Sequence, residues 1–73
     1  MIPIVVHDPE WDEFASIEVA NHAAWWHVMR RLEEEWDCPR GYRLVTADGE
    51  PIQDAPAPRK LPTPIRLTYL PPA

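Results

Sequence analysis

The segment with sustained helical periodicity, residues 21–37 (NHAAWWHVMRRLEEEWD), places the strongest constraint on the fold. Its large apolar residues are separated by three, four and four positions, which aligns them along one side of a helix: Trp25, Val28, Leu32 and Trp36. An isolated amphipathic helix cannot bury such a stripe, so the rest of the chain must supply a second layer. We therefore expect one central helix over about residues 21–37, with Asn21 as its N-cap.

Alternating segments before this helix predict that the second layer is a sheet. Residues 1–6 (MIPIVV) are typical of a strand whose residues point alternately to its two sides. Residues 14–19 (FASIEV) alternate in polarity as well, with Ser16 and Glu18 expected to point outward. The acidic segment 7–13 (HDPEWDE) between them is typical of a turn. Because this connection is too short for a parallel crossover, the two strands should form an antiparallel hairpin.

The second half of the chain predicts a strand at residues 42–46 (YRLVT) and a last strand at 65–70 (IRLTYL). A tight turn at Asp48-Gly49 should lead into a brief strand at 50–52, which a proline interrupts. Residues 53–64 contain four prolines and predict an irregular crossing, with Leu61 as its anchor in the core.

Together these elements predict an α+β fold of two layers, in which a mixed sheet of four to five strands packs on the single helix. The last strand can close the sheet beside the first. With 73 residues and one cysteine, the chain is expected to form one small domain that has no internal disulfide.

The order of these strands and the helix resembles that of the β-grasp fold of ubiquitin and its relatives over nearly the whole chain. In the stretch IEVANHAAWWHVMRRL, the pair Glu18-Val19 precedes the helix, and the helix stripe has the spacing that ubiquitin uses for its own core. The segments Arg43-Leu44-Val45 and Ala47-Asp48-Gly49 resemble the family's third strand and turn, and IRLTYL resembles its closing strand. The resemblance implies a single ubiquitin-like domain over residues 1–73.

The chain also departs from the family. Conjugated modifiers and sulfur carriers end in Gly-Gly, whereas this sequence ends in Pro71-Pro72-Ala73, which is too rigid to thread an activating enzyme. A carrier or modifier is therefore the least favoured reading. Only part of ubiquitin's apolar recognition patch has a counterpart in this sequence: Val45 matches one position of the patch, and Thr68 stands in place of an apolar residue.

Charge is distributed unevenly around a net value of −5. Residues 1–39 hold nine acidic residues and two arginines, whereas residues 40–73 hold five basic and three acidic residues. An acidic chain without a basic cluster is poorly suited to nucleic acid, and we expect no binding to DNA or RNA. No apolar run approaches the ~18 residues of a membrane span, and no leader is evident. We expect a cytoplasmic protein, or a virion-associated one if a phage encodes it.

Residues that carry chemistry are present but poorly arranged. His22 and His27 are five positions apart, which is not the spacing of a helical zinc site. Cys38 follows several acidic residues, which should raise the pKa of its thiol and suppress the thiolate. The acidic segments lack the ligand spacing and the glycine of a calcium loop. We expect no catalytic, metal or cofactor site.

Two tryptophans have no obvious role in the core. Trp11 lies in the acidic turn, where it either folds back over the hairpin or forms an interface. Trp26 lies beside the helix stripe and is either a rim residue of the core or a contact residue. Candidate interface residues are therefore Trp11, Trp26, Val45, Arg66 and Thr68.

The sequence favours a non-catalytic, ubiquitin-like module that binds another protein, one with a basic surface. It would be a small adaptor or accessory subunit of a larger bacterial or phage assembly. A virion or decoration protein, which would self-assemble, is the alternative.

Overall fold

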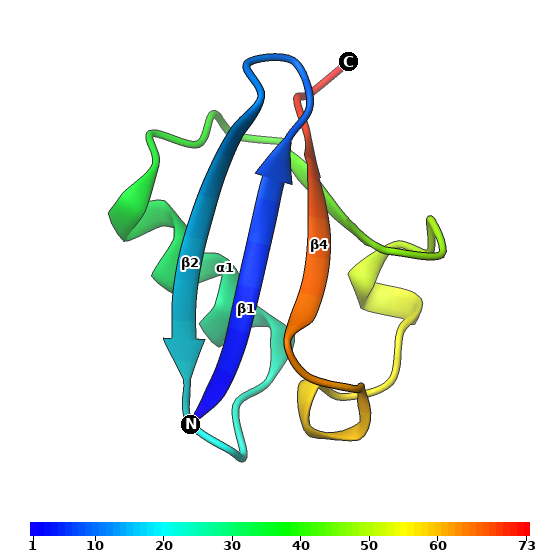
Figure 1. Ribbon diagram of the computed structural model, residues 1–73. Helices are drawn as coiled ribbons and strands as arrows, with labels where there is room; N and C mark the ends of the chain where they lie inside the picture. Colours follow the sequence, from blue (N-terminus) through cyan, green and yellow to red (C-terminus); the bar gives the residue numbers. More distant parts are fainter.

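The computed structural model describes residues 1–73, and its elements follow the predicted order (Figure 1). In chain order they are β1 (Ile2–Asp8), β2 (Glu13–Val19), α1 (Trp25–Glu35), β3 (Arg43–Thr46), the 3₁₀ turns η1 (Ile52–Asp54) and η2 (Pro58–Lys60), and β4 (Ile65–Leu70). The helix crosses behind the strands, so the molecule has one sheet layer and one helix layer.

The four strands form one mixed sheet in the order β2-β1-β4-β3. β1 pairs with β2 in antiparallel fashion and with β4 in parallel fashion, and β4 pairs with β3 in antiparallel fashion. The first and last strands of the chain are therefore neighbours in the middle of the sheet. The predicted α+β class, with a mixed sheet and a single helix, is confirmed.

Strand alternation decides which side chains face the helix. Ile2, Ile4 and Val6 of β1 are at most 5% exposed, and the corresponding residues of the other strands are also buried. Val28 and Leu32 of α1 fill the centre with no exposed surface, while Trp25 and Trp36 cover its margin. Each fully buried aliphatic side chain contributes about 1.5–3 kcal/mol, so this layer-to-layer core is the main source of stability.

The helix begins four residues later than predicted, at Trp25, and its N-cap is Ala24. The expectation of an Asn21 N-cap was wrong, because a turn in which the Ala23 N–H donates to the Ala20 carbonyl precedes the helix. This turn carries Ala23 into the core, where it is 4% exposed. The Ala24 N–H instead donates to Nδ1 of His27 at 2.9 Å.

The helix ends at Glu35, where the Trp36 N–H donates to the Leu32 carbonyl. Its last turn is acidic and contains no basic residue. Arg31 offsets part of the unfavourable interaction with the helix dipole, since its Nη1 lies 3.0 Å from Oε1 of Glu35 and 3.7 Å from Oε1 of Glu34.

The predicted strand at residues 50–52 is reduced to one bridge between Val45 and Pro51. Proline has no N–H with which to extend the ladder, and the chain turns into η1. The crossing that follows is held by Ile52 and Pro58, which are buried, whereas the expected anchor Leu61 is only half-buried. Nε1 of Trp25 also donates to the Pro56 carbonyl at 3.0 Å.

The single helix is too short and too polar to cross a bilayer.

Candidate functional site

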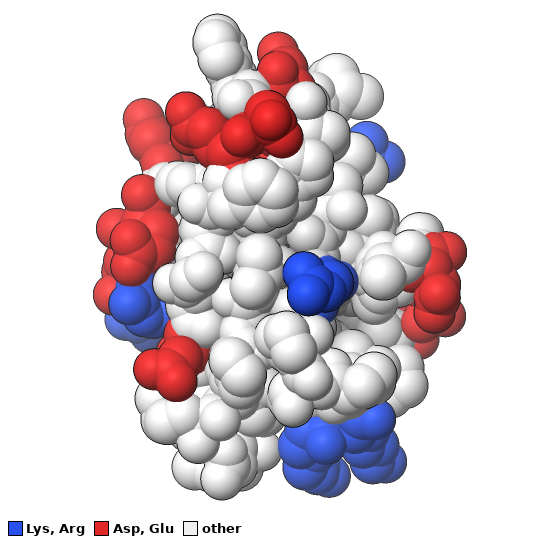
Figure 2. Space-filling view, in the orientation of Figure 1, with Lys and Arg blue, Asp and Glu red and all other residues white.

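The side of the sheet that faces away from α1 is uncovered, and we call it the open face. It consists of the outward residues of the four strands: Pro3, Val5, His7, Phe14, Ser16, Glu18, Arg43, Val45, Arg66, Thr68 and Leu70. Figure 2 views this face and shows a largely uncharged surface with one basic side chain near its middle. Acidic side chains gather around its margins instead.

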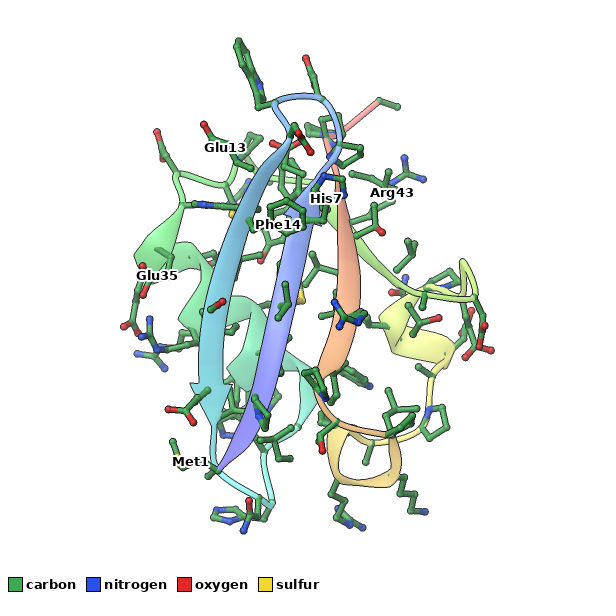
Figure 3. The ribbon with its side chains drawn as sticks, in the orientation of Figure 1. Met1, His7, Glu13, Phe14, Glu35 and Arg43 are labelled. Atoms are coloured by element: carbon green, nitrogen blue, oxygen red, sulfur yellow. The ribbon has the colours of Figure 1, made fainter.

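One row of the open face crosses all four strands. Phe14 pairs with His7, His7 with Thr68, and Thr68 with Val45, so these residues are adjacent across the sheet. The Phe14 ring stacks on the His7 ring with centroids 4.4 Å apart, as Figure 3 shows, yet Phe14 remains 63% exposed. An aromatic residue so placed is typical of a contact surface.

The His7 ring is held in place by a second contact. Its Nε2 lies 2.9 Å from Oδ1 of Asp12, which has the left-handed backbone angle φ 52° in the β1–β2 turn. This contact restrains the His7 ring on which Phe14 stacks, and such a restraint lowers the entropic cost of binding.

The next row contains Ser16, Val5 and Arg66, which are paired across β2, β1 and β4. Arg66 is exposed and forms no salt bridge within the molecule. An unpaired cation near the middle of a largely uncharged face favours a partner that presents an acceptor at that point.

The structure brings three of the predicted interface residues together and separates the other two. Val45, Arg66 and Thr68 share the open face. Trp11 lies in the β1–β2 turn and is 72% exposed, and Trp26 lies on α1 and is 58% exposed. Neither tryptophan folds into the core.

Trp26 belongs to a different surface. Its ring stacks on that of His27 with centroids 3.7 Å apart, beside a shallow hollow between the end of β2 and α1. Sequence reasoning missed Phe14 and His7. Phe14 has the same strand parity as Ser16 and Glu18, which were predicted to face outward, and that parity is the signal that identifies it.

The remaining chemistry-bearing residues are dispersed. Cys38 is half-buried, and burial, followed by the charges of Glu33 and Asp37, raises the pKa of its thiol above the ordinary value. No three His, Cys, Asp or Glu side chains are grouped in a way that could hold a metal ion.

No model of a known protein family matches this sequence, and no curated protein matches it significantly. The fold and the open face define the chain as a small α+β protein with one helix on a four-stranded mixed sheet.

Proposed function

We propose that the protein is a ubiquitin-like β-grasp module. One helix packs across a mixed sheet whose central pair, β1 and β4, is parallel and joins the two ends of the chain. A hairpin precedes the helix, and a strand, a tight turn and a long crossing follow it. This is the arrangement that the likeness to ubiquitin implied, with the brief fourth strand reduced to the Val45–Pro51 bridge.

The module acts, in this proposal, by binding another protein as a non-catalytic adaptor or accessory subunit of a bacterial or phage assembly. The observation that carries the proposal is the row of Phe14, His7, Thr68 and Val45 across an uncovered sheet face. Exposed aromatic residues on an otherwise uncharged patch supply much of the affinity at protein interfaces. Arg66 beside this row would fix the orientation of the partner.

A virion or decoration protein is the second candidate. β2 is an edge strand of seven residues, paired only with β1, and its outer edge can accept a strand from another copy. Such pairing would generate repeating contacts between copies.

The test is site-specific photo-crosslinking in the host that encodes the protein. A photoreactive residue replaces Ser16 on the open face in one variant and Arg59 in η2 in the control. We expect one discrete heterologous adduct from position 16 that is absent from position 59. Equal labelling from both positions, or none from position 16, would refute the proposed face.

The identity of the adduct separates the two candidates. An enzyme or secretion subunit supports the adaptor, and a capsid protein, or adducts between copies of the chain, supports the virion protein. Phe14→Ala should weaken binding to the captured partner by about 2 kcal/mol, as measured by calorimetry.

A further inference from the structure

The β1–β2 turn, the segment after α1 and the end of β4 meet at one end of the molecule (Figure 1). Residues of these three segments line a hollow of about 400 Å³. We call it the acidic groove. Its walls carry five carboxylates and no basic residue: Asp8, Glu10, Glu13, Glu35 and Asp37. Figure 3 labels Glu13 on the hairpin and Glu35 on the helix. Of the five, only Glu35 forms a salt bridge, with Arg31.

Aromatic rings form the rest of the groove. Trp11 from the turn and Trp36 at the helix end both line it, together with Tyr69 of β4. Trp36 meets Tyr69 edge to face, with centroids 5.7 Å apart and an angle of 85° between the rings. A site that combines carboxylates with indole rings is suited to a cation, because both attract positive charge.

Tyr69 is the independent indication of a ligand. The residue is only 8% exposed, and its ring is stacked on Tyr42, but its hydroxyl makes no hydrogen bond within the protein. No polar side-chain atom is both fully buried and unpaired, so this hydroxyl keeps some accessible surface, and Tyr69 lines the groove. Burial and the nearby Cys38, Asp8 and Glu10 raise the pKa of the Tyr69 hydroxyl, as its position among the carboxylates requires.

The shape of the groove distinguishes among cations. A compact metal ion needs several ligands at one point, and the carboxylates of this groove are spread along its walls without forming such a group. A guanidinium is flat, carries five donors and is weakly hydrated, so it can stack on an indole while donating to carboxylates and to a tyrosine oxygen. A lysine ammonium is more strongly hydrated and stacks less well.

We propose that the acidic groove binds the arginine side chain of a partner protein. The choice of a protein as the source of the arginine rests on the proposed function. Recognition of the guanidinium rests on the groove alone.

The first experiment titrates the ¹⁵N-labelled full chain with acetyl-Gly-Arg-Gly-amide and follows the four indole N–H signals by NMR. We expect the Trp11 and Trp36 signals to shift and the Trp26 signal to stay in place. The matched lysine peptide should bind at least threefold more weakly, and the neutral citrulline peptide should cause no shift. Equal binding of lysine, binding of citrulline, or unshifted Trp11 and Trp36 signals would overturn the inference.

Two variants test the groove residues. Tyr69→Phe keeps the ring and removes the hydroxyl, which should weaken binding of the arginine peptide about fivefold and leave the melting temperature unchanged. Glu10→Gln should weaken it to a similar extent, whereas the control Asp48→Asn, with the same charge change outside the groove, should not. Equal effects of Glu10→Gln and Asp48→Asn would show attraction to net charge and refute a site.

The outcomes for the groove and for the open face are separable. An arginine peptide that binds while position 16 yields no adduct leaves the groove standing and refutes the proposed function. A discrete adduct at position 16 together with no peptide binding does the reverse.

Discussion

The hydroxyl of Tyr42 donates a hydrogen bond to Oε2 of Glu33 at 2.6 Å and lies 3.4 Å from the carbonyl oxygen of Met29. Tyr42 directly precedes β3, and Glu33 lies in the last turn of α1, so this contact ties the helix end to the sheet. It also gives the Glu33 carboxylate a donor at the end of the helix where the dipole disfavours negative charge.

Tyr42→Phe should lower the free energy of unfolding by about 1 kcal/mol, because it removes a hydrogen bond to a partly exposed carboxylate. Urea denaturation followed by tryptophan fluorescence measures the change. Tyr69→Phe is the matched control, since it removes a hydroxyl that has no partner within the protein and should change stability little. Equal losses in the two variants would show that the Tyr42–Glu33 bond does not stabilise the fold.

Stability should decline on the alkaline side. Burial is the main cause that raises the pKa values of Cys38, Tyr42 and Tyr69 above their ordinary values of 9.0, 10.0 and 10.0. The folded chain therefore holds these protons more tightly than the unfolded chain does. The contribution of these protonated groups to the free energy of unfolding is complete below about pH 9. It is lost as the pH rises through their pKa values in the folded state.

Urea midpoints measured from pH 7 to pH 11 test this dependence. The midpoint of the native sequence should fall above about pH 9 to 10. The fall should be smaller in the double variant Tyr42→Phe with Tyr69→Phe, which removes both phenols. An identical slope in the two proteins would contradict the role given to the tyrosines.

Phe14→Ala should leave the free energy of unfolding within about 0.5 kcal/mol of the native value, because the ring is 63% exposed. Leu32→Ala is the contrasting variant. It truncates a side chain that has no exposed surface and leaves a cavity, so it should lower the free energy of unfolding by about 2.7–5 kcal/mol. Thermal unfolding distinguishes the two, and a large loss from Phe14→Ala would assign that ring to folding rather than to contact.

Local pattern was sufficient for much of the fold. Alternation in β2 identified the buried side of that strand, and the spacing of Val28 and Leu32 identified the buried side of α1. The strand and the helix each face the core on one side and water on the other. Apolar residues therefore recur along the sequence with the period of the strand or of the helix.

The candidate sites depend on pairing between distant segments, which local pattern does not specify. Phe14 and His7 meet through the register of the hairpin, and His7 reaches Thr68 only because β4 lies beside β1. The acidic groove forms where the β1–β2 turn, the segment after α1 and β4 converge, so the unpaired hydroxyl of Tyr69 has no signature in the sequence.

The displaced helix start provides a direct test of the helix N-terminus. Ala24 is the N-cap and offers no side-chain acceptor to the first amides of α1, whereas Asn21 lies in the preceding turn. Ala24→Asp should therefore stabilise the fold by about 0.5–1 kcal/mol, since its carboxylate can accept an N–H of the first turn and favours the positive end of the dipole. Asn21→Ala should change stability little, because no cap depends on it. If Asn21→Ala instead costs about 1 kcal/mol and Ala24→Asp gives no gain, the helix in solution begins at the residue that the sequence pattern first indicated.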